Sequence, residues 1–305
     1  EDPYLGSKIA KARVSGFQGL DLSSPSTIAA CAKHFAAYGF VEAGRDYNTA
    51  DVGASTLNNI ILPPFKAAKD AGVKTFMNSF NDLNGIPATG DTYLQRTVLK
   101  EKWNFDGFIV SDWGSISEMV AHGYAKGDNH AAELAINAGS DMDMESHLYV
   151  NELASLVKEG KVDPALINDA ARRILKVKFE LGLFDDPYKY CDEAREASVI
   201  GSQSNLSEVL DLAKKSIVLL KNENNLLPLA KKGKNIAVIG ALASDKTSPL
   251  GNWRLAADIN SAVSLLEGLE AYSGNTISYA KGADLVTGKT EFVSDLTINV
   301  TDTSG

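Results

Sequence analysis

The most restrictive feature of this sequence is a repeated alternation of short apolar runs with amphipathic segments over residues 28–145. The apolar runs cover residues 28–35, 73–77, 108–110 and 135–144, and each contains or ends in polar residues. These polar positions are separated by 44, 34 and 31 residues; they are His34, Asn78, Asp112 and Asp143. A (β/α)8 barrel uses about 31 residues for each strand–helix unit. The spacing therefore predicts successive βα units of a parallel barrel.

A helix is predicted near residues 163–182 from its start and stop signals. Asp163 can cap the first turn and Pro164 suits the first helical position, while Gly182 stands where helices commonly end. Between these signals, apolar residues recur at steps of three and four, which places them on one face; they are Ile167, Ala170, Ile174, Val177 and Leu181. We expect this helix to pack on the core of the first domain.

The character of the sequence changes between residues 183 and 206, which are polar, contain one proline and show no clean period. We interpret this stretch as a linker. Beyond it, the sequence predicts a helix over residues 206–215 and strands over residues 216–222, 234–240 and 276–284, the middle one apolar enough to be fully buried. These elements indicate a second α/β unit, which we expect to be unfinished at residue 305.

Composition and spacing argue against several classes of partner. The formal net charge of −9 disfavours nucleic acid and anionic membranes as partners. No segment approaches the roughly 18 consecutive apolar residues of a spanning helix, so we expect no membrane insertion. The cysteines and histidines do not have zinc-site spacing, and residues 240–243 lack the glycine-rich turn of a dinucleotide site. We therefore expect the chemistry to need no metal and no organic cofactor.

Side chains at the carboxyl ends of barrel strands converge on the open face, where active sites form. Lys33, His34, Asn78, Asp112 and Trp113 all fall at such positions. Polar groups of this kind can bind hydroxyls, while an indole can cover the apolar C–H face of a sugar ring. Taken singly, Asp112 could also be a helix cap or a loop acid, and Trp113 a core residue. Together they predict a site for a polyhydroxylated ligand.

Five motifs give this chain a resemblance to glycoside hydrolase family 3, and in particular to its bacterial β-glucosidases. They occur in the order typical of that family, and the resemblance runs over nearly the whole chain. The motifs are Lys33-His34-Phe35-Ala36-Ala37-Tyr38-Gly39, Gly44-Arg45-Asp46-Tyr47-Asn48, Asn84-Gly85-Ile86-Pro87-Ala88-Thr89, Gly107-Phe108-Ile109-Val110-Ser111-Asp112-Trp113-Gly114 and Val218-Leu219-Leu220-Lys221-Asn222.

The resemblance implies a retaining exo-β-glycosidase that removes terminal, non-reducing β-D-glucosyl residues from an oligosaccharide or an aryl β-glycoside. Asp112 would be the nucleophile that forms the glycosyl-enzyme intermediate. Lys33 and His34 would hold hydroxyls of the attacked sugar, and Trp113 would form part of its platform. Phe80 stands where many members carry tyrosine, so it would line the same site without a hydroxyl.

The resemblance also implies how the chain is divided. Residues 1–182 would be the second half of the catalytic barrel, residues 183–206 a linker, and residues 207–305 the first part of an α/β sandwich domain. The acid/base glutamate would come from beyond residue 305. We therefore expect the remaining segments of the same enzyme as a partner, and a periplasmic or extracellular location.

Two alternatives share most of these features. A β-xylosidase or arabinofuranosidase of the same family would use the same mechanism with a different sugar pocket. A non-catalytic carbohydrate-binding relative would keep the pocket and lack the acid/base residue.

Overall fold

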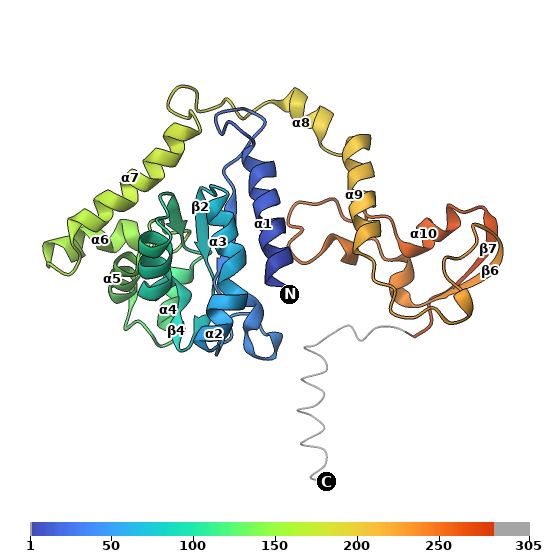
Figure 1. Cartoon of the computed structure of the whole chain (residues 1–305), viewed down its shortest axis with the longest axis horizontal. Helices are drawn as coiled ribbons and strands as arrows, with labels where there is room; N and C mark the ends of the chain where they lie inside the picture. The colour runs from blue at the N-terminus through green and yellow to red at the C-terminus, as the bar shows by residue number, and fades with distance from the viewer. Residues whose placement is uncertain (1, 284–305) are drawn as a thin grey trace, which may run out of the picture. The chain divides into compact units, whose positions relative to one another are not determined.

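The computed structural model describes residues 2–283, which form two compact units (Figure 1). The first unit ends at Ser202 and the second begins at Gln203. Both contain α-helices and a parallel sheet, so the predicted α/β class is confirmed. The predicted linker, residues 183–206, contains the helix α8 (Glu193–Val199), and residues 284–305 of the predicted second domain lie outside the described residues.

The sheet of the first unit consists of β1 (Cys31–Phe35), β2 (Thr75–Asn78) and β5 (Phe108–Val110). Both strand pairs are parallel and the order is β1-β2-β5, so strands that follow one another along the chain lie side by side. This arrangement is that of successive βα units in a barrel wall. The prediction of strands at these three apolar runs is confirmed.

The fourth apolar run, residues 135–144, is mostly not a strand. Its first residues belong to α5 (Asp128–Ala138), which ends where Gly139 adopts φ +115°. Only Met142 continues the sheet, through a parallel bridge to Val110. The prediction of a strand from residue 135 was wrong, because a short apolar run looks the same in a buried helix as in a buried strand.

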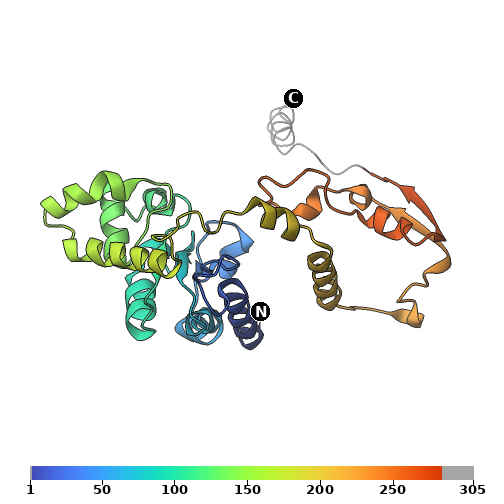
Figure 2. The same ribbon diagram turned by 90° about the horizontal axis from the view of Figure 1, so that it is seen from above.

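Helices and two small strands complete the first unit. Residues 57–61 and 93–102 have π-helical hydrogen bonding. In Figure 2 the helices α5, α6 and α7 lie together, as their contacts also indicate. The remaining elements are α1 (Pro3–Gln18), α2 (Ala54–Thr56), α3 (Leu62–Asp70), β3 (Asp82–Leu83), β4 (Ile86–Pro87), α4 (Ser115–Ala121), α6 (Leu148–Lys158) and α7 (Pro164–Glu180).

The core of the first unit consists of two hydrophobic clusters. One cluster joins the sheet to the helices that follow β1 and β2, and fully buried Phe35, Phe76 and Ile109 lie in it. The other cluster lies among α4, α5, α6 and α7 and includes Met119 and Leu156. The apolar residues of the strands therefore hold the sheet in the core, and the polar residues at the strand ends remain available to form a site.

The predicted helix over residues 163–182 is confirmed as α7. The carboxylate of Asp163 accepts the N–H of Ala165 at 2.8 Å, and Gly182 follows the helix end with φ +73°. Arg173 of this helix donates to the carbonyl oxygens of Phe105 and Gly107 at 2.8 and 2.9 Å. The helix therefore anchors the segment that leads into β5.

The second unit contains α9 (Gln203–Ser216), β6 (Lys232–Ile239), α10 (Leu265–Glu270) and β7 (Gly274–Ala280). β6 and β7 pair in parallel, and they and α9 confirm three predicted elements. Residues 217–222 are not a strand, since no described residue pairs with them. β6 is not buried as predicted: only Val238 is, because a two-stranded sheet has little to cover it.

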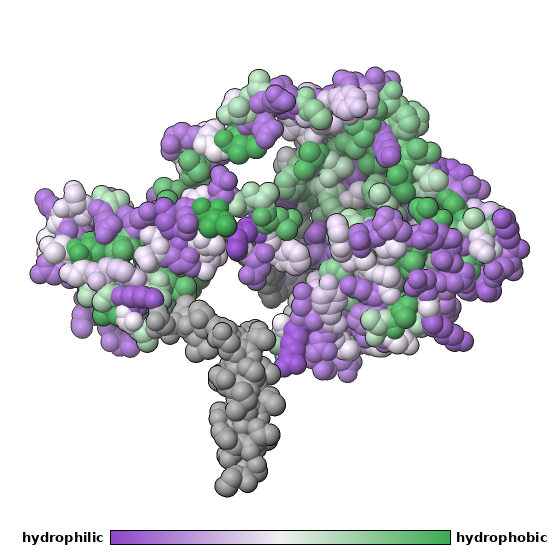
Figure 3. All heavy atoms as spheres, turned by 180° about the vertical axis from the view of Figure 1, so that it is seen from behind, coloured by the Kyte–Doolittle hydropathy of each residue, from purple (hydrophilic) through white to green (hydrophobic). Residues whose placement is uncertain are grey.

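Hydrophobic side chains also reach the surface of both units, as the space-filling view shows in green (Figure 3). In the second unit they include Ile217, Val218 and Leu220, each at least 75% exposed. Such exposure of large apolar residues in series is unusual for a surface that faces water.

Candidate active site

Asp112 lies two residues beyond the end of β5 and is only 7% exposed. Its Oδ1 accepts the backbone N–H of Trp113 at 2.7 Å. The flanking residues are tied to the neighbouring segment, because Ser111 N–H donates to the Met142 carbonyl and Gly114 N–H to the Met144 carbonyl, both at 2.9 Å. The position of the Asp112 carboxylate is therefore set by backbone hydrogen bonds on both sides.

His34 approaches Asp112 from β1, which is two strands away in the sheet. Its Nε2 lies 3.4 Å from Oδ2 of Asp112, although β2 separates the strands that carry the two residues. Oδ2 has no hydrogen-bond partner within residues 2–283. One oxygen of the carboxylate is thus fixed by the backbone, and the other keeps its lone pairs uncommitted.

The surroundings of His34 favour the neutral form of its imidazole. Burial lowers its pKa, and the positive charge of Lys33 lowers it further, against the opposing charges of Asp112 and Asp46. A neutral imidazole has one donor and one acceptor nitrogen, so it can bind a hydroxyl in either sense. This property suits a residue that faces a polyol.

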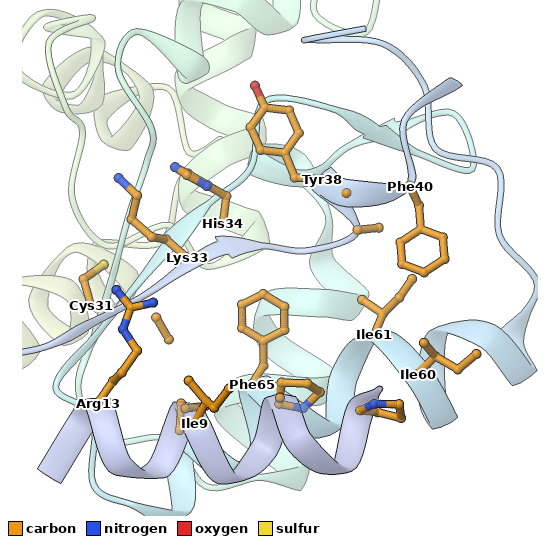
Figure 4. A pocket seen from close by; sticks show the side chains of 18 of the residues that line it. Ile9, Arg13, Cys31, Lys33, His34, Tyr38, Phe40, Ile60, Ile61 and Phe65 are labelled. Atoms are coloured by element: carbon orange, nitrogen blue, oxygen red, sulfur yellow. The ribbon is translucent and has the colours of Figure 1, made fainter. Parts of the chain in front are cut away.

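The structure brings Lys33 and Trp113 to the same region as His34 and Asp112. Lys33 is exposed, and the side chains of Lys33, His34 and Tyr38 point away from α1 (Figure 4). Trp113 is 63% exposed, so it is not a core residue. The roles of Lys33, His34 and Trp113 in binding a sugar stay predictions.

Phe80 follows β2 by two residues and belongs to a cluster of three aromatic rings with Tyr38 and Tyr47. Its ring centroid lies 6.1 Å from that of Tyr38 and 4.5 Å from that of Tyr47. Tyr38 in turn meets His34 edge-on, with centroids 5.4 Å apart. Phe80 is therefore connected to the candidate site through Tyr38.

Two polar residues at predicted strand ends make hydrogen bonds within the first unit. Asn78 is fully buried and donates to Oγ of Ser140 at 2.8 Å. Asp143 accepts the hydroxyl of Ser146 and, at 3.1 Å, the N–H of Tyr149 near the start of α6. Asn78 Oδ1 has no hydrogen-bond partner within residues 2–283, and the place of Asn78 in the lining of the site stays a prediction.

Asp46, Tyr47 and Glu118 lie beside the site but were not among the predicted site residues. Asp46 accepts the hydroxyl of Tyr38 and, at 3.1 Å, the N–H of Tyr47. Burial raises the pKa of Glu118, and the negative charges of Asp112 and Asp46 add to that rise while His122 opposes it. The signal for Asp46 and Tyr47 was present, because both belong to the motif over residues 44–48.

A cavity of about 890 Å³ lies between α1, β1 and α3 (Figure 4). Asp112 does not line it, so this cavity is not centred on the candidate nucleophile. The cavity runs along the edge of β1 that pairs with no described strand. Lys33 and His34 lie at its polar end, and its apolar lining includes Ile9, Ile61 and Phe65.

Within residues 2–283 no three His, Cys, Asp or Glu side chains are grouped so that they could hold a metal ion. None of the helices in that range is long and apolar enough to cross a bilayer. The groups that the structure brings together at the site are a carboxylate, an imidazole, an amine and aromatic rings.

Known proteins are similar to this chain in sequence. The model of the glycosyl hydrolase family 3 N terminal domain matches residues 1–177, and that of the family 3 C-terminal domain matches residues 217–302. A periplasmic beta-glucosidase of Salmonella typhimurium is 40% identical over 294 residues, which cover 95% of this chain and 38% of the relative. A beta-xylosidase of Formosa agariphila is 36% identical over 303 residues, covering 93% of this chain and 42% of the relative.

Solved structures give the same result. The beta-glucosidase from Listeria innocua in complex with gluconolactone is 36% identical, with a TM-score of 0.84 over 98% of this chain and 41% of that one. A beta-glucosidase involved in saponin metabolism from intestinal bacteria is 34% identical, with a TM-score of 0.85 over 94% of this chain and 40% of that one. The chain thus spans about two fifths of the length of these relatives, and it belongs to glycosyl hydrolase family 3.

Proposed function

We propose that this chain carries the nucleophile of a retaining exo-β-glycosidase, and that the nucleophile is Asp112. The observation that carries the proposal is the Asp112 carboxylate at the end of β5, with one oxygen fixed by the Trp113 N–H and the other facing His34 at 3.4 Å. A carboxylate fixed in this way can attack an anomeric carbon without a large loss of orientational freedom.

In the proposed first step, the carboxylate of Asp112 forms a bond to the anomeric carbon while the bond to the leaving oxygen breaks. A second carboxyl group gives its proton to that oxygen, and in retaining enzymes the two groups lie about 5–5.5 Å apart. In the second step, water replaces the Asp112 ester bond and returns a proton to the second group. Lys33, His34 and Trp113 would hold the sugar during both steps.

We propose glucose as the sugar, and terminal β-D-glucosides as the substrates. The Salmonella and Listeria relatives, both named beta-glucosidases, support this choice. A β-xylosidase is the second candidate, because relatives named beta-xylosidase are 36% and 34% identical over 93% of this chain. Hydrolysis of 4-nitrophenyl β-glucoside and β-xyloside under the same conditions separates the two candidates.

We further propose that the rest of the same enzyme completes the site and supplies the acid/base glutamate. Support comes from the two-fifths coverage of the relatives and from β1, which pairs on one side only among the described residues. The name of the Salmonella relative supports a periplasmic location.

The nucleophile is tested by covalent labelling of the full-length polypeptide. A 2-deoxy-2-fluoro-β-glucoside with a good leaving group should add one fluorosugar, which peptide mapping should place on Asp112. Asp112→Asn should remove turnover while the thermal unfolding temperature stays close to that of wild type. Label at another residue, or hydrolysis by Asp112→Asn, would contradict the assignment of the nucleophile.

A further inference from the structure

Tyr47 is an exposed aromatic residue whose backbone adopts an uncommon conformation and is held there by its neighbours. Its backbone has φ +64°, in the left-handed region that residues other than glycine seldom adopt. Such a conformation persists only where surrounding contacts hold it, and it is common at ligand sites. Here Asp46 accepts the Tyr47 N–H at 3.1 Å and is itself held by the hydroxyl of Tyr38.

The ring of Tyr47 packs against another ring, and the residue is still partly open to solvent. The ring lies against Phe80, with centroids 4.5 Å apart and an angle of 40° between the rings. The residue is nevertheless 43% exposed. An exposed aromatic residue that is backed by another ring can stack on a sugar or an aryl group.

The ring contacts of Tyr47 indicate which ring it would cover. Contacts link His34 to Tyr38, Tyr38 to Phe80 and Phe80 to Tyr47, with centroid separations of 5.4, 6.1 and 4.5 Å. Tyr47 is thus connected to His34 through two other rings, and we assign it to the ring beyond the sugar that His34 would hold. It still feels the charge of Asp112, which contributes, after burial and the charges of Glu118 and Asp46, to a raised pKa of its hydroxyl.

We propose that Tyr47 is the aromatic platform for the leaving group, and that it stacks on the second sugar ring or the aryl ring attached to the sugar that Asp112 attacks. Phe80 backs this platform, and Asp46 is a positioning residue that holds its backbone. The proposal rests on the proposed glycosidase function and adds to it a preference for substrates whose leaving group contains a ring.

The test compares leaving groups with and without a ring in the full-length polypeptide. The substrates are 4-nitrophenyl β-glucoside, a β-linked glucose disaccharide and β-glucosyl fluoride, whose leaving atom cannot stack. Tyr47→Ala should lower kcat/KM about tenfold for the first two substrates. It should change kcat/KM for the fluoride less than twofold, and Tyr47→Phe should resemble wild type on all three.

Matched variants keep the result interpretable. Tyr93 on the π-helical segment is equally exposed, at 42%, and lies outside this cluster, so Tyr93→Ala should leave all three values unchanged. Tyr47→Leu keeps the apolar bulk without the ring and should show the same selective loss, which covers the case that Tyr47→Ala does not fold.

The outcomes separate this proposal from the one on which it rests. If wild type hydrolyses the substrates but Tyr47→Ala and Tyr47→Leu lose activity equally on all three, or on none, the platform is overturned and the glycosidase stands. If wild type hydrolyses none of the three substrates and takes up no fluorosugar label, the glycosidase function itself is overturned.

Discussion

Replacing Gly107 by alanine should displace the strand that leads to Asp112. Gly107 directly precedes β5, and a Cβ atom there would lie 2.1 Å from the carbonyl oxygen of Lys74 and 2.7 Å from Cζ of Phe105. Real Cβ atoms do not come closer than 3.0 Å to such neighbours. The start of β5 would therefore have to move away from the segment that precedes β2.

The size of the effect follows from the contacts that such a movement disturbs. The hydrogen bond from Phe108 N–H to the Lys74 oxygen, 3.3 Å long, would break, which costs about 1 kcal/mol. Strain from an inserted methyl group in a packed region adds about 1–3 kcal/mol. We expect a local destabilisation of about 2–4 kcal/mol, and about a hundredfold loss of kcat/KM if Asp112 shifts by about 1 Å.

Amide hydrogen exchange measures this local change in the full-length polypeptide. Peptides that cover residues 105–113 should exchange roughly 30- to 1000-fold faster in Gly107→Ala, which corresponds to the expected loss of local stability. Gly16 provides the control, because it lies exposed in α1 with no atom within 4 Å of its Cβ position. Gly16→Ala should stabilise that helix by about 0.5–1 kcal/mol.

Two results would refute this reasoning. If residues 105–113 of Gly107→Ala exchange at the wild-type rate, β2 and β5 do not approach as closely as described. Faster exchange with unchanged kcat/KM would mean that the backbone of β5 does not set the position of Asp112.

Two further predictions follow from the charged groups of the first unit. Lys33→Met should raise the pKa of His34, because the Lys33 charge helps to lower it; the acidic limb of the kcat/KM–pH profile should then move to higher pH, and Lys33→Arg should leave it in place. Asp141→Asn should lower stability by about 3–5 kcal/mol, because it leaves Lys100, whose Nζ lies 2.6 Å from Asp141 Oδ1, buried without its partner. The double variant Lys100→Met/Asp141→Leu should recover most of that loss in thermal unfolding, and a failure to recover would show that the pair itself is needed.

The sequence located the strand ends because an apolar run followed by polar residues marks where a buried parallel strand leaves the core. This rule found Lys33, His34, Asp112 and Trp113. It does not give the direction of the Asn78 side chain, because that direction depends on the pleat and on nearby polar groups. Here Ser140 offers the Asn78 amide a buried partner at 2.8 Å.

The loop residues could not be placed from sequence in the same way. Asp46 and Tyr47 lie in the long connection between β1 and α2, which has no hydrophobic period from which to read a direction. Their place beside Phe80 depends on contacts between residues more than 30 positions apart. The motif over residues 44–48 marked them as notable, but only the fold shows what they contact.

Burial in the second unit could not be read from the apolar run of β6 either. Its sequence fits a strand covered on both faces, yet among the described residues β7 is its single neighbour in the sheet. An apolar run therefore indicates the degree of burial for which a strand is suited. The layers that cover the strand have to be taken from the structure.

Glu118 is the described carboxyl group that could be mistaken for the missing acid/base residue. Its pKa is raised above the ordinary 4.5, and Asp112 contributes to the rise, which is the pattern of a general acid. However, its Oε2 is buried and has no hydrogen-bond partner within residues 2–283. Oδ2 of Asp112 is buried in the same way, so burial alone does not separate the two carboxyl groups. Because the proposed acid/base glutamate comes from the rest of the enzyme, we expect Glu118 to be a buried charge and not a proton donor.

Glu118→Gln distinguishes a buried charge from a proton donor, because the first role predicts higher stability and the second predicts a loss of activity on poor leaving groups. Because the folded state raises the pKa of Glu118, its ionised form opposes folding once the pH exceeds the ordinary value of 4.5. The neutral variant should therefore unfold at a higher temperature than wild type near pH 7, and this gain should vanish as the pH falls below 4.5. Its kcat/KM should change equally for good and poor leaving groups. A loss confined to poor leaving groups, with rescue by azide, would make Glu118 the acid/base residue and would remove the need for a glutamate beyond residue 305.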